Sequence, residues 1–236
     1  MSTIPLDRLR SMKDRHLTTF AQRLSDAGLT RPKQIRPWDE DPVFVPLMAR
    51  ISQRTLVDKK RCHMLWQLAR RVAKIPGEVA EIGVYRGGTA RLLAEILSPA
   101  GKTIHLFDTF EGMPETDPER DLHRAGDFSD NSLAEVKAFL AGAGSLEFHQ
   151  GFFPATSGPT KDKTFAFVHV DTDIYRSVLD CCEFFYPRLS AGGVMVFDDY
   201  GFLSCPGAKA AVDEFFARTQ DAPLYLPSAQ AVVIKT

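Results

Sequence analysis

The chain has 236 residues, 44% of them hydrophobic, which is enough for one substantial α/β core. Its 29 basic and 30 acidic side chains give a formal net charge of −1 at pH 7. This balance excludes the strong positive field that attracts nucleic acid or an anionic membrane surface, so we expect neither as a partner.

The sequence indicates a soluble, cytoplasmic protein. Its start, MSTIPLDRLRSMKDRHL, is charged and lacks the apolar core of a secretory signal. No later run approaches the ~20 apolar residues that a membrane span needs. The cysteines show no metal-ligand spacing, and we expect buried thiols in a reducing compartment at Cys62, Cys181, Cys182 and Cys205.

Residues 1–75 are helical in pattern. The stretch LDRLRSMKDRHLTTFAQRLSDAGL carries apolar residues at three- and four-residue spacing and stops at Gly28. After the proline-containing connection TRPKQIRPWDEDP, two more helices are expected around Val45–Ile51 and Thr55–Ala73. No low-complexity linker detaches this segment, so we predict a helical cap or lid on a main domain formed by 76–236.

From Pro76 onward, strands alternate with helices, which predicts an α/β fold with a doubly wound, mostly parallel, seven-stranded sheet. The last two strands flank the turn PSA and are predicted to form an antiparallel hairpin. The predicted strands are Val79–Gly83, Thr103–Asp108, Leu146–Gln150, Phe165–Asp171, Gly193–Asp198, Pro223–Leu226 and Gln230–Ile234. The predicted helices are Gly88–Leu97, Ser132–Ala141, Ile174–Pro187 and Gly207–Arg218.

The stretch EVAEIGVYRGGTARLLAEIL joins an apolar strand, a glycine turn and an amphipathic helix. Gly83, Gly87 and Gly88 let the backbone pass close to a ligand, and the helix start offers N–H groups. A dinucleotide turn needs G-x-G-x-x-G, whereas this one reads E-x-G-x-x-x-G-G and begins with Glu81. An acid there suits the ammonium and hydroxyl groups of S-adenosylmethionine better than a pyrophosphate. A tight turn that binds nothing is the alternative.

Asp108 ends the next strand, in TIHLFDTFEGMP, 27 residues after Glu81. A carboxylate after the second strand of a nucleotide-binding sheet can accept both ribose hydroxyls. A helix-capping aspartate is the alternative, and the glycine turn upstream favours the ribose role.

Carboxylates also end two later apolar strands. Asp171 follows FAFVHV, Asp198 and Asp199 follow GGVMVF, and 26 residues lie between Asp171 and Asp198. This gap fits a helix and a turn, and therefore a βαβ crossover. If the strands are neighbours about 4.8 Å apart, the carboxylates face one small volume at the end of the sheet where ligands bind.

Uncompensated carboxylates in one volume would repel one another and raise each other's pKa values. A divalent cation relieves this repulsion, and an oxygen-only ligand set favours Mg²⁺ over Zn²⁺. Helix N-capping by Asp171, Asp173 or Asp199 is the alternative. Capping explains one acid well but four acids at two strand ends poorly, so the pattern favours a metal.

These motifs resemble the macrocin O-methyltransferase (TylF-type) family of class I S-adenosylmethionine-dependent methyltransferases, found among enzymes that tailor the sugars of natural products. The resemblance runs from about Arg54 to Phe216 and includes RTLVDKKRCHMLWQLARRVAKIPGEVAEIGVYRGGTA, LFDTFEGMPETD, HRAGDFS, HVDTDIYRSVLDCCEFFYPRLSAGGVMVFDDYG and AVDEFF, in the family's order. A series of this length is far more specific than one motif.

The resemblance implies Mg²⁺-dependent transfer of a methyl group from S-adenosylmethionine to a hydroxyl of a small molecule. It implies metal ligands at Asp171, Asp198 and Asp199. It implies that Asp108 binds the ribose of the cofactor and that residues 126–129 lie on the adenine side. The cofactor residues implied are Glu81, Gly83, Tyr85, Arg86, Gly87, Gly88, Thr89, Asp108, Phe110, Gly126, Asp127, Phe128, Ser129 and Asp171.

Asp173 matches the acid proposed in the family as general base, and His123 in LHRAGD is a second base candidate. His169 lies within an apolar strand, which favours a hydrogen-bonded core residue. The chain departs from the family at Thr172, where glycine is usual, and the added side chain bears on the backbone or the acceptor pocket.

Two other hypotheses about function remain. One is a nicotinamide-dependent oxidoreductase, which the glycine spacing disfavours. The other is a non-catalytic S-adenosylmethionine-binding protein, which would not need the acid cluster. The acceptor is open among a macrolide deoxysugar, an aminocoumarin-type glycoside, a free sugar derivative and a phenol. The oligomeric state, including a homo-oligomer, is open as well.

Overall fold

The structure is a computed structural model that describes residues 35–236. The chain divides into two compact units, residues 1–40 and 41–236. In the first unit the described residues form the short helix α2 (Pro37–Glu40), so the predicted connection contains a helical turn. The helix expected before Gly28 lies outside the described residues.

The second unit contains a seven-stranded sheet in the order β3-β2-β1-β4-β5-β7-β6. The first five strands run parallel, β7 is antiparallel to β5, and β6 is antiparallel to β7, as the predicted hairpin requires. The strands are β1 (Glu78–Ile82), β2 (Ile104–Asp108), β3 (Leu146–Gln150), β4 (Phe165–Val170), β5 (Leu189–Phe197), β6 (Leu224–Tyr225) and β7 (Ala231–Ile234).

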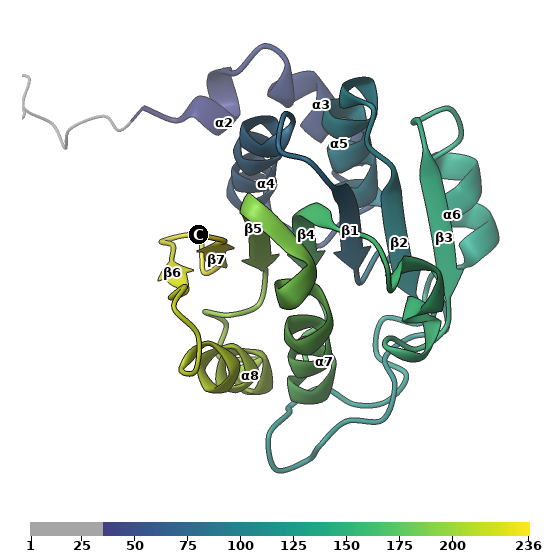
Figure 1. Cartoon of the computed structure of the whole chain (residues 1–236). Helices are drawn as coiled ribbons and strands as arrows, with labels where there is room; N and C mark the ends of the chain where they lie inside the picture. The colour runs from purple at the N-terminus through teal and green to yellow at the C-terminus, as the bar shows by residue number, and fades with distance from the viewer. Residues whose placement is uncertain (1–34) are drawn as a thin grey trace, which may run out of the picture. The chain divides into compact units, whose positions relative to one another are not determined.

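Helices cover both faces of this sheet, with α4 and α5 on one side and α7 and α8 on the other (Figure 1). This arrangement confirms the doubly wound fold class. The helices of this unit are α3 (Phe44–Ile51), α4 (Lys59–Val72), α5 (Gly88–Leu97), α6 (Leu133–Phe139), α7 (Tyr175–Phe185) and α8 (Pro206–Phe216), and the short 3₁₀ turns are η1 (Ser98–Ala100), η2 (Ala155–Thr160) and η3 (Tyr186–Arg188).

Helix α4 shows how local sequence sets an element. Asp58 is its N-cap, and its carboxylate accepts hydrogen bonds from the backbone N–H groups of Lys60 and Arg61. Apolar residues at helical spacing, such as Leu65 and Ala69, are buried. Helices α3 and α4 lie in the same compact unit as the sheet. That residues 1–75 together act as a lid stays a prediction.

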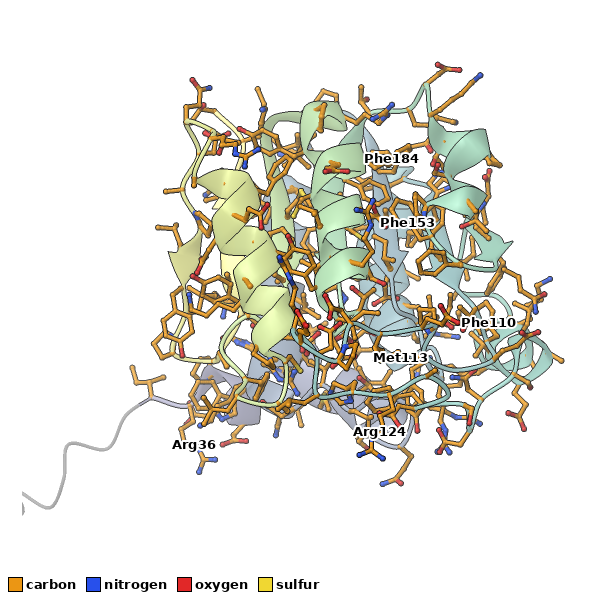
Figure 2. All side chains as sticks on the ribbon, turned by 90° about the horizontal axis from the view of Figure 1, so that it is seen from below. Arg36, Phe110, Met113, Arg124, Phe153 and Phe184 are labelled. Carbon is orange, nitrogen blue, oxygen red and sulfur yellow. The ribbon has the colours of Figure 1, made fainter. Side chains whose placement is uncertain are left out.

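Aromatic side chains fill the layer between the sheet and α7. Phe153 stacks on Phe185 with ring centroids 5.3 Å apart, and it meets Phe184 edge to face at 5.5 Å. Figure 2 shows Phe153 close to Phe184, which belongs to this helix. The doublets Phe152-Phe153, Phe184-Phe185 and Phe215-Phe216 in the sequence favour core packing, but Phe152 is 40% exposed. Burying the other aromatic rings is a main source of stability in this layer.

The predicted boundaries of α5 and β3 match the structure residue for residue. Two elements differ by four residues at their start: α4 begins at Lys59 and not at Thr55, and β5 begins at Leu189 and not at Gly193. The predicted turn RLSAGG contains an irregular pairing instead, because the register with β4 shifts between the Phe165–Leu189 and Phe167–Val194 pairs. Among residues 35–236, no helix is both long and apolar enough to cross a membrane.

Gly83 follows β1 where the chain passes against the end of β4. A Cβ at Gly83 would lie 1.8 Å from the carbonyl oxygen of Asp171, and its φ is +88°. Glycine is therefore required here by the neighbouring backbone as well as by the left-handed conformation. The sequence predicts that Gly83 lets the backbone pass close to a ligand, whereas the contact that excludes a side chain is with the backbone of Asp171.

We expect Gly83→Ala to lower the free energy of unfolding more than Gly126→Ala does. Gly126 has a matching φ of +87° but open space at its Cβ position. The control should cost about 1–2 kcal/mol for the left-handed backbone, and Gly83→Ala should add about 1–3 kcal/mol of steric strain. Urea denaturation of both variants measures the difference, and equal losses would contradict the contact with Asp171.

Candidate active site

A cavity of about 330 Å³ opens where β1, β2, β4 and β5 end. This is the end of a parallel sheet at which ligands bind, and the volume falls within the usual range for small-molecule sites. Gly83, Asp108, Asp171 and Asp199, which end or follow these strands, all line it. The sheet topology therefore brings together acids that are separated by up to 91 positions in the sequence.

Asp108 holds the glycine turn in place. Its Oδ2 accepts hydrogen bonds from the backbone N–H groups of Val84 at 2.7 Å and Tyr85 at 2.9 Å. Its Oδ1 accepts one from the N–H of Phe110 at 2.7 Å. Tyr85 and Phe110 both have positive φ angles, +50° and +54°, which these bonds help to maintain. The carboxylate therefore fixes the turn, and because it also lines the cavity it can face a ligand.

The first turn of α5 is closely packed against the rest of the chain. Gly87 is its N-cap in the left-handed conformation. The N–H of Gly88 donates to the carbonyl oxygen of Arg54 at 3.0 Å, and a Cβ at Gly88 would lie 2.7 Å from that oxygen. Thr89 lines the cavity. This helix start therefore offers a ligand fewer free N–H groups than the sequence suggested.

Two parts of the long connection between β2 and α6 meet beside the cavity. Met113 and Gly126–Asp127 exchange backbone hydrogen bonds, both of 2.8 Å. Next to them, the ring of Phe128 lies edge to face with Tyr85, with centroids 6.4 Å apart. Both of these rings line the cavity, so they can flank a planar group.

Arg86 forms an ion pair with Asp130, with 2.6 Å between Nη2 and Oδ2. Their side chains are 37% and 61% exposed, so the pair contributes little to stability. Arg86 does not line the cavity.

The carboxylates of Asp171, Asp198 and Asp199 converge as the sequence predicts. One ligand oxygen from each lies within 4.8 Å of the others. The backbone explains this convergence, because Val170 pairs with Phe197 in neighbouring parallel strands and the acids follow directly. The N–H of Asp198 donates to the carbonyl oxygen of Val170 at 2.9 Å.

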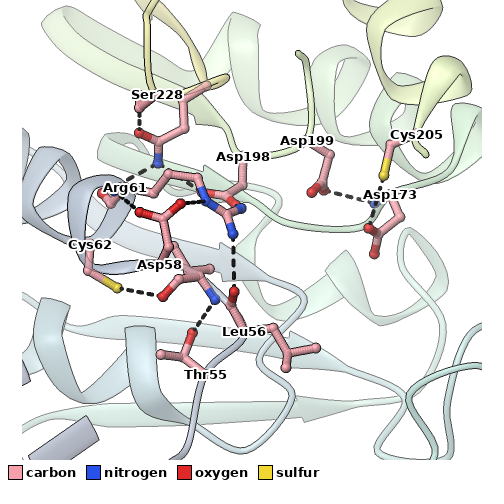
Figure 3. Close-up of polar contacts among 12 residues, drawn as sticks. Thr55, Leu56, Asp58, Arg61, Cys62, Asp173, Asp198, Asp199, Cys205 and Ser228 are labelled. Atoms are coloured by element: carbon pink, nitrogen blue, oxygen red, sulfur yellow. Dashed lines mark hydrogen bonds and ion pairs between the residues drawn. The ribbon is translucent and has the colours of Figure 1, made fainter. Parts of the chain in front are cut away.

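Asp198 differs from the other two acids because the protein already supplies its partners. Arg61, from α4, forms a buried ion pair with it, and the Arg61 guanidinium also donates to Asp58 and to the carbonyl oxygen of Leu56 (Figure 3). The side-chain amide of Gln230 donates to Asp198 Oδ1 at 2.8 Å. Asp198 is fully buried and does not line the cavity.

The pKa directions follow from these partners. Burial raises the pKa values of Asp171 and Asp199, and the neighbouring carboxylates raise them further. Burial also acts on Asp198, but His169 and Arg61 outweigh it and hold the pKa of Asp198 below its usual value. Asp198 is therefore compensated, whereas the negative forms of Asp171 and Asp199, which line the cavity, are disfavoured unless a cation binds beside them.

Glu81 does not line the cavity. Its side chain is fully buried, and the carboxylate is 2.9 Å from Nδ1 of His169. The other imidazole nitrogen is 3.6 Å from Asp198. Burial would lower the pKa of His169, but Asp198 and Glu81 raise it to about 10. The expected core role of His169 is confirmed, whereas a direct contact between Glu81 and a cofactor stays a prediction.

Asp173 occupies a strained turn. Its φ is +59°, and the N–H of Ile174 donates across it to the carbonyl oxygen of Thr172 at 2.6 Å. The left-handed conformation of a non-glycine residue costs of order 1–3 kcal/mol. Thr172 does not have a positive φ, so its place in the chain does not demand glycine. Its side chain lines the cavity, and its hydroxyl is buried without a hydrogen-bond partner among the described residues.

The second base candidate lies next to the first. His123 Nε2 is 3.7 Å from Asp173 Oδ1, and its Nδ1 is 3.2 Å from Asp127 Oδ2. The thiol of Cys205 lies 3.4 Å from Asp173 Oδ1. Burial raises the pKa of Asp173, an effect that His123 partly offsets. A carboxylate with a raised pKa is a stronger base near neutral pH.

The predicted site residues thus divide into two groups. Those that line the cavity are Gly83, Tyr85, Thr89, Asp108, His123, Phe128, Asp171, Asp173 and Asp199. Those that do not are Glu81, Arg86, Gly87, Gly88, Phe110, Gly126, Asp127, Ser129 and Asp198, which support or surround the first group.

Comparisons with known proteins agree with this geometry. The model of the macrocin O-methyltransferase (TylF) family matches residues 45–225. The chain belongs to this family. Demethyldecarbamoylnovobiocin O-methyltransferase of Streptomyces niveus is 31% identical over 183 residues, which are 71% of this chain and 69% of that protein. Mycinamicin III 3''-O-methyltransferase of Micromonospora griseorubida is 30% identical over 179 residues, 68% of this chain and 69% of that protein.

The solved structure of the O-methyltransferase NovP has a TM-score of 0.68 to this chain at 28% identity, covering 78% of this chain and 82% of that one. The calicheamicin methyltransferase CalS11 has a TM-score of 0.66 at 20% identity, covering 92% and 91%, and supports the fold alone. Membership of the TylF family confirms the expected enzyme class, an O-methyltransferase, and decides against the oxidoreductase and binding-only readings.

Several cavity residues were not expected from the sequence. Arg61, Cys205, the exposed ring of Phe152 and the partly buried ring of Phe202 line the cavity. The Arg61 guanidinium also lies 4.8 Å from the centre of the Phe202 ring. The sequence pattern marks Arg61 only as a residue three positions after the N-cap Asp58. It does not reveal that Arg61 pairs with Asp198, 137 positions away.

The acids fit a hard divalent cation. Within residues 35–236, the carboxylate of Asp171 has no hydrogen-bond donor, and Asp199 accepts only the N–H of Asp173 at 3.2 Å. These oxygens would hold the cation, and Asp198 could add the oxygen that now accepts from Gln230. Carboxylate oxygens without sulfur or imidazole at this cluster suit Mg²⁺.

We expect Arg61→Met to lower the free energy of unfolding by about 3–5 kcal/mol, because it leaves Asp198 buried without its main cation while the apolar stem is kept. Arg50→Met is the control. It removes the pair with Glu95, whose side chains are 55% and 35% exposed, and should cost under about 1 kcal/mol. Urea denaturation measures both, and a loss for Arg61→Met as small as the control's would contradict the buried pair.

Proposed function

We propose that this enzyme transfers a methyl group from S-adenosylmethionine to a hydroxyl of a natural product, on a sugar or a phenol, with the help of a divalent cation. The observation that carries the proposal is the shared cavity. A glycine turn with its ribose-type acid Asp108 lies at one side, and Asp171, Asp173 and Asp199 lie at the other. A methyl donor and a deprotonated hydroxyl would then meet in one volume.

The cofactor half is supported by the side chains around the glycine turn. Oδ2 of Asp108 already accepts two N–H groups, whereas Oδ1 accepts only that of Phe110 and keeps one lone pair for a ribose hydroxyl. Phe128 and Tyr85 offer rings against which an adenine can pack. When bound, S-adenosylmethionine supplies the methyl group.

The acid half supports the chemistry at the acceptor. A divalent cation held by Asp171 and Asp199 would stabilise a developing alkoxide by several kcal/mol. Asp173, beside those acids, accepts the hydroxyl proton. His123 positions Asp173 and is in turn held by Asp127.

The acceptor class is supported by the relatives and by the cavity wall. One relative, from Streptomyces olivaceus, is named as a 4'-O-methyltransferase of a rhamnosyl tetracenomycin, and another as a 3''-O-methyltransferase of mycinamicin III. In this chain, apolar side chains line the cavity at Leu56, Met113, Phe152 and Phe202. Leu56 is 62% exposed, as expected of a rim that meets an apolar aglycone. We therefore favour a sugar hydroxyl carried by an apolar aglycone over a free sugar.

The direct test is a radiolabelled methyl-transfer screen of glycosylated and phenolic acceptors with Mg²⁺ present. We expect incorporation of label from S-adenosylmethionine into at least one glycosylated acceptor, and we expect excess chelator to abolish it until Mg²⁺ is restored. The metal part of the proposal is wrong if full activity persists in chelator. The methyl-transfer part is wrong if the protein does not bind S-adenosylmethionine in calorimetry.

We expect Asp173→Asn to lower kcat by roughly 10²–10⁴-fold, the usual contribution of a general base. Stability should stay the same or rise, because the change removes a like charge from the acid cluster and asparagine tolerates the left-handed turn. His123→Gln is the matched comparison. As a positioning residue it should cost less than Asp173, and the opposite order of the two kcat losses would make His123 the base.

A further inference from the structure

A second group of ionisable side chains lies on strands β1, β2 and β3, away from the cavity. His105 is fully buried in β2, and the register places it beside Glu147 of the edge strand β3. His149 follows two positions later and therefore lies on the same face. Glu78 starts β1 next to them. None of these residues lines the cavity.

The ligand atoms of this group have the spacing of a metal site. His105 Nδ1 lies 3.0 Å from His149 Nε2 and 3.3 Å from Glu147 Oε2. One ligand atom from each of the three residues lies within 4.8 Å of the others. Tetrahedral zinc with bonds of 2.0–2.2 Å holds neighbouring ligand atoms about 3.3 Å apart. The two measured distances are close to that value.

The other nitrogen of His105 is held as metal-bound histidines usually are. His105 Nε2 donates to Glu78 Oε2, and Glu78 Oε1 is fixed by Lys163 at 2.8 Å. A carboxylate in this position sets the tautomer and directs the lone pair of Nδ1 toward a metal ion. Here that lone pair faces His149 and Glu147.

Hydrogen bonding alone leaves this group incompletely satisfied when His105 is neutral. One proton can lie between His105 Nδ1 and His149 Nε2, but the Glu147 carboxylate faces the same Nδ1 and has no proton to share with it. Lys163 is already engaged by Glu78. A cation between the three residues would bind His105 Nδ1, His149 and the Glu147 carboxylate at once. The alternative is a second proton on His105, which would pair with Glu147 without a metal.

We propose that His105, Glu147 and His149 bind Zn²⁺ or a similar borderline transition-metal ion, with water as the fourth ligand and Glu78 as the supporting carboxylate. The imidazole nitrogens distinguish this site from the oxygen-only acid cluster, which suits harder cations. Because its ligands come from β2 and β3, the ion would fasten the edge strand to the sheet (Figure 1). The proposal is independent of the methyl-transfer reaction.

The test is a titration of metal-free protein with Co²⁺, followed by its visible absorption, and with Zn²⁺ in competition. The comparison variants are His149→Ala, Glu147→Gln, Glu78→Gln and Cys205→Ser. The last one removes the thiol of the other mixed cluster, formed by His123, Asp173 and Cys205. We expect His149→Ala and Glu147→Gln to lose one Co²⁺ equivalent that Cys205→Ser retains. Glu78→Gln should weaken that equivalent roughly 10–100-fold.

Zn²⁺ should also raise the Tm of the wild type and of Cys205→Ser but not that of His149→Ala. Glu147 is 53% exposed, so Glu147→Gln keeps the test valid if His149→Ala fails to fold. Equal Co²⁺ stoichiometry and Kd in the wild type and Glu147→Gln would overturn the proposal. It would also be overturned if Cys205→Ser alone lost the ion, or if His105 proved doubly protonated in the presence of Zn²⁺.

Discussion

The buried negative charge at the ends of β4 and β5 is the constraint on which the rest of the site depends. Asp171, Asp198 and Asp199 gather there, and a fourth buried carboxylate, Glu81 of β1, lies on the other side of His169 from Asp198. Unpaired charges in a protein interior are costly, so each needs a partner or must take up a proton. Arg61 and His169 lie against Asp198 and Glu81 and offset two of the four charges.

The remaining two carboxylates, Asp171 and Asp199, are those that face the cavity. One divalent cation could balance the charges of both carboxylates once they are ionised. The protein thus divides its acids: Glu81 and Asp198 have partners within the fold, and Asp171 and Asp199 are left for an ion and its ligand. Arg61 comes from α4, so a helix outside the sheet takes part in this charge balance.

Much of this could be predicted from sequence because it depends on local signals. Apolar runs that end in Asp108, Asp171 and Asp198 mark parallel strands and the site at their ends, and the predicted neighbours β4 and β5 do pair. What could not be predicted depends on contacts between distant segments. The ion pair of Arg61 with Asp198 and the clash that excludes a side chain at Gly83 are of this kind. The sequence likewise pointed to an effect on the backbone at Thr172, where the family usually has glycine, whereas the residue with the strained backbone is its neighbour Asp173.

The central claim is that Asp171 and Asp199 bind a divalent cation. The most direct test adds Mn²⁺ to metal-free protein and counts the bound ions by electron paramagnetic resonance. Asp199→Asn is the variant and Asp130→Asn, an exposed acid outside the cluster, is the control. The account predicts one tightly bound Mn²⁺ in the wild type and the control, displaced by excess Mg²⁺, and none in Asp199→Asn. Equal Mn²⁺ binding by the wild type and Asp199→Asn would contradict it.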